Sequence, residues 1–137
     1  MSQSGLINLT SGEQETALVY FESAVVDFTQ AQLVTLMTTD AAQYFIPLGL
    51  SSKCLTFNTV TARQISGNFG FTPASYNDYG SVIITLNALY NFFTYDQFVI
   101  DQSKPMVPPS TALIFDLTGP DTATSYTGKI IVYGFFA

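Results

Sequence analysis

The sequence predicts a mainly β, single-domain protein, an antiparallel β-sandwich or jelly roll with one short α-helix. The chain has 137 residues, a length that suits one hydrophobic core rather than two. Its composition is 47% hydrophobic and 15% aromatic, as expected of a globular protein rather than a disordered one. Val, Ile, Thr, Tyr and Phe occur in short runs separated by Gly, Pro, Asn, Asp and Ser, which is the pattern of strands and turns.

The strands follow one another along most of the chain. The first spans residues 16–28, where Leu18 and Tyr20 alternate with Val19 and Phe21. Short strands with turn residues between them at this spacing are typical of sandwiches and jelly rolls. The other predicted strands are residues 43–47, 53–65, 67–71, 81–86, 96–100, 112–117 and 129–136.

One segment predicts a helix instead. Thr29 and Gln32 have the spacing of a capping box, and apolar residues then recur at nearly helical spacing. We therefore expect a short α-helix near residues 30–37. Residues 88–95 are a weaker candidate for a second helix, because β-preferring Phe and Thr residues lie within them.

Three segments rich in turn residues should be exposed loops. Residues 76–80 include Asn, Asp and Gly, which tolerate left-handed backbone angles. Residues 104–110 contain three prolines, which cannot donate hydrogen bonds to a central strand. Residues 118–125 should join the last two strands as a long hairpin.

We predict that the chain consists of an amino-terminal arm, residues 1–12, and a β-sandwich domain, residues 13–137. The arm is polar apart from Leu6, Ile7 and Leu9. Three behaviours are open for it: docking on a neighbouring subunit, docking on its own domain, or flexibility. The first residues lack the features of a secretory signal, and no apolar run is long enough to span a membrane. We expect a soluble protein made in a cytoplasm, without a membrane partner.

Charged residues are unusually scarce. Only 10% of residues are charged, and ten acidic against four basic residues give a net charge of -6. The scattered basic residues form no stripe, which argues against binding nucleic acid. Thr, Ser, Asn, Gln and apolar atoms must then cover most of the surface, and such a surface favours a subunit that is covered by other protein. We therefore expect a homo-oligomer.

The residues needed for most enzyme chemistry are missing. The chain contains no histidine, which removes the commonest general base near neutral pH and the commonest zinc ligand. Its single cysteine, Cys54, can form neither an internal disulfide nor a multi-thiolate metal site. We predict no enzymatic activity, no catalytic residues, no cofactor and no bound metal.

Three weaker alternatives remain open. Paired carboxylates, Asp96 with Asp101 or Glu13 with Glu15, are the one catalytic device that the composition permits. Asp116 and Asp121 bracket a Gly-Pro turn and are candidate oxygen ligands for calcium. The eight tyrosines suggest a carbohydrate-binding surface, although the chain has no Trp, the usual stacking residue.

Aromatic residues are more numerous than a small core needs. The chain has twelve Phe and eight Tyr, and aromatic side chains are enriched at the buried centres of interfaces. The alternative for the last strand is that Ile130, Val132 and Phe135, or their neighbours, fill the sandwich. The predicted interface residues, from the arm, the 76–80 loop and the last strand, are Leu6, Ile7, Leu9, Tyr76, Tyr79, Tyr133, Phe135 and Phe136.

Residues 28–39 contain the pattern T-x-x-Q-[IL]-x-x-L-x-[TS]-[TS], and Ile46-Pro47 ends a predicted strand with the pattern hydrophobic-[IV]-P. In these segments the chain resembles small virion-associated structural proteins of tailed phages, in which the first pattern forms a helix and the second a strand. Residues 55–60 and the final hydrophobic-tyrosine run at 129–133 continue the resemblance, which covers about two-thirds of the chain. The chain departs from the pattern at residues 48–51 and in its acidic residues 13–22.

The resemblance implies a non-enzymatic structural role in a virion. Such proteins commonly decorate or cement a capsid as trimers or other symmetric oligomers, which makes the major capsid protein or other virion proteins the expected partners. A protein associated with the tail, baseplate or fibre is the first alternative, and a carbohydrate-binding adhesion module is the second.

Overall fold

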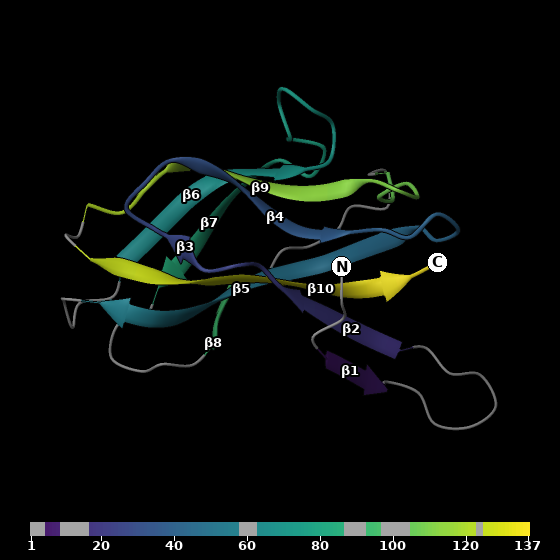
Figure 1. The fold of residues 1–137 in the computed structure, drawn as a ribbon, viewed down its shortest axis with the longest axis horizontal. Helices are drawn as coiled ribbons and strands as arrows, with labels where there is room; N and C mark the ends of the chain where they lie inside the picture. Colours follow the sequence, from purple (N-terminus) through teal and green to yellow (C-terminus); the bar gives the residue numbers. More distant parts are fainter. Residues whose placement is uncertain (1–4, 9–16, 58–62, 87–92, 97–104, 123–124) are drawn as a thin grey trace.

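The prediction of a mainly β protein is confirmed. The computed structural model describes residues 5–8, 17–57, 63–86, 93–96, 105–122 and 125–137. In this part of the chain the regular elements are strands in two antiparallel sheets, which lie as two layers in Figure 1, and none is a helix. It therefore includes no helix that is long and apolar enough to cross a membrane.

The first sheet, sheet A, has six strands. Five of them run in the order β1-β2-β10-β5-β8, and β3 also pairs with β10. All described pairings are antiparallel. The strands are β1 (Gly5–Asn8), β2 (Ala17–Glu22), β3 (Val26–Asp27), β5 (Phe45–Phe57), β8 (Phe93–Asp96) and β10 (Tyr126–Phe136).

The second sheet, sheet B, has four strands in the order β4-β9-β6-β7. Its outermost described strands are thus β4 and β7. The strands are β4 (Gln32–Thr38), β6 (Arg63–Gly70), β7 (Ser81–Leu86) and β9 (Ala112–Gly119).

One hydrophobic cluster joins the two sheets. Sheet A contributes Phe45 and Ile130, and sheet B contributes Phe69 and Phe115, all without solvent exposure. Along β10 the residues of this cluster alternate with residues that face away from it, as the pleat of a strand requires. Each sheet therefore has an inner face on the core and an outer face, and partner proteins can reach only the outer faces and the edges.

The long pairing of β5 with β10 is the centre of sheet A. Its register shifts twice, between Thr127 and Gly128 and between Tyr133 and Gly134, because β5 holds an extra residue at Leu55 and at Leu48. Such bulges bend a strand and increase its twist. Residues 43–47 and the start of 53–65, predicted as separate strands, are thus parts of one bulged strand.

The predicted helix at residues 30–37 is wrong. Residues 32–38 form β4, with Val34 and Leu36 buried and Leu33 56% exposed. A register shift between Thr35 and Met37 turns both Leu36 and Met37 to the core. This bulge gives a strand the apolar spacing of a helix, and it explains the error.

The predicted long hairpin at residues 118–125 is also wrong. β9 pairs with β4 and β6 in sheet B, whereas β10 pairs with β2, β3 and β5 in sheet A. The segment between them therefore crosses from one layer to the other. Turn residues mark a change of direction, but they do not say which strand becomes the neighbour.

Most other strand predictions are close to the observed bounds. Residues 81–86 match β7, and residues 112–117 and 129–136 lie within β9 and β10. The predicted strand 16–28 is interrupted at residues 23–25, between β2 and β3. Residues 88–92 and 97–104 lie outside the described residues, so the predicted strand 96–100 is placed only at Asp96, the last residue of β8.

Candidate functional site: sheet edges and an apolar groove

The outer face of β10 holds two of the predicted interface residues. Ile130 and Val132 belong to the core, so Tyr133 and Phe135 point to the other face of sheet A, where both are half-buried. Phe136 points inward instead, and its ring lies 5.5 Å from that of Phe45. The alternative that the last strand fills the core therefore holds in part: Ile130 and Val132 pack in the core, whereas Phe135 does not.

A row of four residues crosses sheet A at Tyr133. Tyr133 lies opposite Tyr20 of β2 on one side and opposite Gly49 of β5 on the other, and Tyr20 lies opposite Gly5 of β1. A Cβ atom at Gly49 would overlap the Tyr133 phenol, so the ring occupies the space over this glycine. The tyrosine ring therefore packs against the backbone of Gly49 and does not project into solvent.

The remaining predicted interface residues are distributed over separate regions. Leu6 and Ile7 lie in β1, which pairs with β2, and Leu9 lies outside the described residues. Tyr76 is half-buried in the turn between β6 and β7. Tyr79 is 4% exposed, so it offers little surface to a partner.

Tyr79 instead ties two loops together. Its ring lies 5.1 Å from that of Phe69, and its hydroxyl donates a 2.6 Å hydrogen bond to the Pro105 carbonyl. Burial, together with the nearby Asp78 charge, raises the pKa of the Tyr79 hydroxyl well above its usual value. The hydroxyl therefore stays protonated and able to donate.

Asp78 organises the 71–80 loop, which projects from the two layers in Figure 1. Its carboxylate accepts hydrogen bonds from the Phe71 and Thr72 amides, at 2.7 and 2.8 Å, and from the Thr72 hydroxyl at 2.6 Å. Burial alone would raise the pKa of Asp78, but these hydrogen bonds outweigh it and hold the pKa below its ordinary value. The same loop holds Ala74 at a φ of 81°, a left-handed conformation that glycine adopts more easily.

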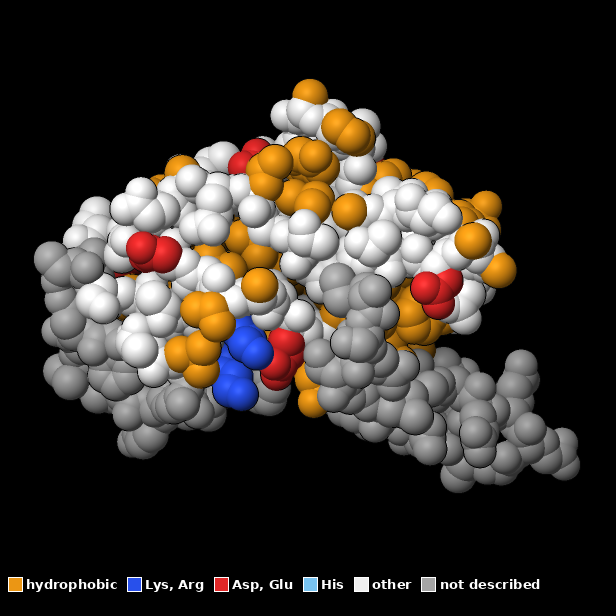
Figure 2. Space-filling model, viewed as in Figure 1, with side chains coloured by type: hydrophobic (Ala, Val, Ile, Leu, Met, Phe, Trp, Pro, Cys, Tyr) orange, Lys and Arg blue, Asp and Glu red, His pale blue; other side chains and the backbone are white. Residues whose placement is uncertain are grey.

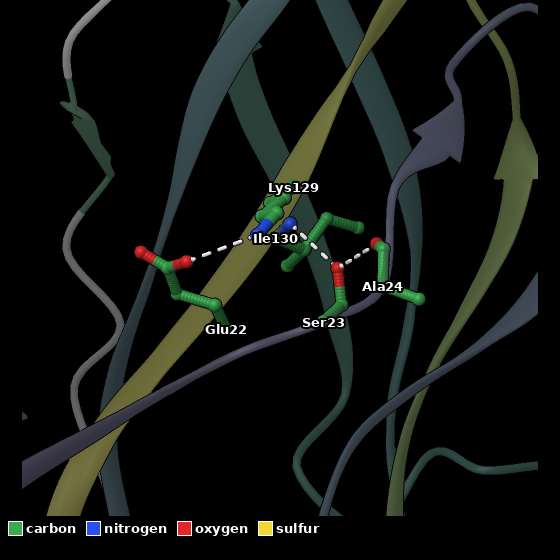
Figure 3. A network of polar contacts seen from close by, with 5 residues as sticks. All are labelled: Glu22, Ser23, Ala24, Lys129 and Ile130. Atoms are coloured by element: carbon green, nitrogen blue, oxygen red, sulfur yellow. Dashed lines mark hydrogen bonds and ion pairs between the residues drawn. The ribbon is translucent and has the colours of Figure 1, made fainter. Parts of the chain in front are cut away.

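Ser23 fixes the bend between β2 and β3 (Figure 3). Its buried hydroxyl accepts a 3.0 Å bond from the Ile130 amide and donates a 2.7 Å bond to the Ala24 carbonyl. Beside it, Lys129 and Glu22 form a partly exposed ion pair at 3.3 Å. The bend carries Val25 outward, where it is 59% exposed.

The bend at Ser23 and the edge strand β4 enclose an open groove of about 210 Å³. Its exposed large hydrophobic side chains are Val25 from the bend and Leu33 from β4. None of the lining residues that the structure describes is charged. The groove is lined by Ala24, Val25, Val26, Gln32, Leu33, Val34 and Thr35.

A short turn between β3 and β4 connects the two sides of this groove. The Asp27 carboxylate accepts bonds from the Thr29 hydroxyl at 2.6 Å and the Thr29 amide at 3.0 Å, which lower the pKa of Asp27. The Gln32 side-chain amide donates to the Asp27 and Gln30 carbonyls, at 2.9 and 3.1 Å. Thr29 and Gln32, predicted to cap a helix, thus stabilise a turn into a strand.

The edges of both sheets are almost free of charge. The outermost described strands are β1 and β8 in sheet A and β4 and β7 in sheet B. Three of them contain no charged residue, none contains Pro, and β8 contains only Asp96. Natural proteins usually protect such edges with Lys, Pro or inward-pointing charges, because unpaired strand edges bind other strands.

Comparison with known proteins found no relative. No family model matches the chain, and no match was found among curated proteins or solved structures. Among the described residues, no three Asp, Glu or Cys side chains gather as a possible metal site.

Sequence reasoning missed the residues of the groove. A helix over residues 30–37 would not single out Leu33, and a continuous strand over residues 16–28 would not expose Val25. The available signal was the alternation of Leu33 and Thr35 with Val34 and Leu36, which suits a strand with its even-numbered residues inside.

Proposed function

We propose that this chain is a non-enzymatic structural subunit of a phage particle, which decorates or cements the capsid by binding the major capsid protein and copies of itself. Its fold in this proposal is a single β-sandwich domain. The observation that carries the proposal is the near absence of charge from the edge strands, which suits surfaces that other protein covers.

The exposed apolar side chains support the same conclusion. Val25, Leu33 and Ile83 are each more than half exposed, at 59%, 56% and 57%. Figure 2 shows few charged side chains on the visible face, separated by large uncharged and hydrophobic areas. A lone soluble protein of net charge -6 gains solubility from its charges, but local apolar surface of this kind favours contact with protein.

A cement protein acts through many modest contacts. Symmetry repeats each contact, so a protomer held at several sites leaves the lattice far more slowly than a protomer held at one. No reactive side chain is needed for this role, and a closed cyclic oligomer, with a trimer as the favoured case, would supply the repetition.

Imaging of whole particles tests the proposal. Electron cryo-microscopy of the phage that encodes this chain should show density for the two-sheet fold at symmetry-related positions on the capsid lattice. Density at the tail, baseplate or fibre would replace the capsid assignment with the alternative location. Particles that lack the chain, together with a purified monomer that binds glycans in an array, would contradict the structural role and favour an adhesion module.

A further inference from the structure

The edge strand β4 combines three properties that suit it to bind another strand. It pairs with β9 alone among the described strands, so the backbone groups along its other side are not part of a ladder. An open groove lies along that side. The strand carries no charged residue and no Pro. Unpaired N–H and C=O groups along such an edge are a template for a further strand.

The opposite edge of sheet B differs in one respect. β7 is also uncharged, and Ile83 is as exposed as Leu33, at 57% against 56%. However, both edge strands lie beside strands of sheet A, β7 beside β5 and β8 and β4 beside β2 and β10, and the groove lies at β4. The groove therefore makes β4 the better docking edge, and Ile83 provides a matched control.

The charge distribution indicates which partner fits the groove. Two copies of a chain with a net charge of -6 repel each other wherever their acidic residues meet. The described residues of the groove and of β4 carry no charge, so two copies can approach there without bringing these like charges into contact. A surface that pairs with its own copy must be self-complementary, and an uncharged strand edge meets this requirement when it runs antiparallel to itself.

We propose that β4 pairs antiparallel with β4 of a second copy of this chain, so that the two four-stranded sheets join across the groove. The bulge at Leu36 leaves residues 32–35 as the regular stretch of β4. With Val34 at the two-fold axis, regular pairing covers residues 33–35, and Leu33 of each copy lies opposite Thr35 of the other. Val25, on the far wall of the groove, then covers the apolar side of the joined strands.

This contact is short, and we expect weak, concentration-dependent self-association. The inference rests on the proposed function for its biological role, because one weak two-fold contact becomes effective when a lattice holds both copies. Its test, however, needs only the purified full-length chain.

The experiment compares the wild type with Leu33→Asp, Val25→Asp and the control Ile83→Asp. Each substitution adds one negative charge at a site of nearly equal exposure. Light scattering over a micromolar dilution series measures the dissociation constant, and far-UV circular dichroism checks the fold. We expect Leu33→Asp and Val25→Asp to weaken self-association about tenfold or more, with Ile83→Asp close to wild type.

Hydrogen exchange provides a second readout that does not depend on substitutions. In the wild type, the amides of β4 should exchange more slowly at high than at low protein concentration, with β7 unchanged. Val25 lies outside the strand, so Val25→Asp keeps the test valid if Leu33→Asp does not fold.

Three results would overturn the inference: a wild type that stays monomeric at every concentration, folded Leu33→Asp and Val25→Asp variants that associate as the wild type does, or an equal loss in Ile83→Asp. A chain found on particles as isolated copies would leave the proposed function intact and remove the β4 contact. The two proposals can therefore fail separately.

Discussion

The phenol ring of Tyr133 in β10 occupies the space over Gly49, its neighbour across the sheet in β5. A Cβ atom at position 49 would come within 2.9 Å of the ring Cε1 and still closer to Cζ and the hydroxyl oxygen. The glycine is thus required by the tyrosine, and the pair lies on the outer face of sheet A beside a β-bulge at Leu48.

This relationship predicts that Gly49→Ala is destabilising and that removing the ring rescues it. The alanine should cost about 1–3 kcal/mol of unfolding free energy, because the added methyl displaces the phenol. In a Tyr133→Ser background the same substitution should cost much less. Urea unfolding of the four variants measures the coupling.

A matched control is Gly128→Ala. A Cβ atom there would overlap the Lys53 carbonyl and approach the Phe28 ring to 2.8 Å, so backbone obstructs it. We expect a larger loss of stability that Tyr133→Ser does not relieve. Equal coupling of both glycines to Tyr133 would contradict this assignment.

The buried hydroxyl of Ser23 should be important for stability. Ser23→Ala leaves the Ile130 amide without its hydroxyl acceptor and removes the donor to Ala24, which we expect to cost about 1–3 kcal/mol. The control is Ser81→Ala, whose exposed hydroxyl donates to Asn68, with an expected change of about 0.5 kcal/mol or less. Thermal and urea unfolding compare the two variants, and equal losses would argue against a special role for the Ser23 bend.

The strand assignment of β4 predicts that alanine substitution costs much more stability at one of its leucines than at the other. Leu36 has no exposed surface, so Leu36→Ala should cost about 2–5 kcal/mol of unfolding free energy. Leu33 is 56% exposed, so Leu33→Ala should change the stability by about 0.5 kcal/mol. Similar losses at both positions, measured by urea unfolding, would contradict the observed strand.

Acid should weaken the 71–80 loop through Asp78. Hydrogen bonds hold its folded-state pKa below the ordinary 3.8, so the carboxylate stabilises the fold above pH 3.8. This stabilisation is lost as the pH falls from 3.8 through the lower, folded-state pKa. We expect Asp78→Asn to reduce the pH dependence of stability in that acid range. Thr72→Val, which removes one of the donors, should reduce it in part, as measured by urea unfolding at a series of pH values.

Two substitutions in the same loop should act in opposite directions. Ala74 has a φ of 81°, so Ala74→Gly should relieve strain and stabilise the protein by about 0.5–1 kcal/mol. Gly80 has a φ of 92° and open space at its Cβ position, so Gly80→Ala should cost about 1–2 kcal/mol through its backbone alone. Melting temperatures that change in the same direction for both variants would contradict this account.

Local patterns predicted those parts of the fold that depend on local chemistry. Residues 81–86 are apolar and β-branched, and they form β7 at the predicted bounds. Residues 76–80 and 104–110 are rich in turn residues, and their described parts connect strands. Of the predicted interface residues, Tyr133 and Phe135 lie on an outer face, whereas Tyr79 is in the core.

Contacts between distant residues decided the rest. Residues 30–37 have an apolar spacing that fits both a helix and a bulged strand, and pairing with β9 selects the strand. Likewise, residues 118–125 carry turn signals, but pairing with strands that are distant in the sequence, β4 for β9 and β2 for β10, places β9 and β10 in different sheets. The exposed Val25 and Leu33 become one groove only because β4 passes beside the bend at Ser23.

The sequence by itself determined the β class, the main turns, the scarcity of charge and the lack of histidine, because these depend on composition and on short-range preferences. Only the tertiary structure decided which strands are neighbours, which apolar residues remain outside, and where an uncharged edge meets a groove. The physical reason is that strand pairing is a long-range interaction: its hydrogen bonds and buried area come from residues far apart in the chain, and short windows of sequence do not contain them.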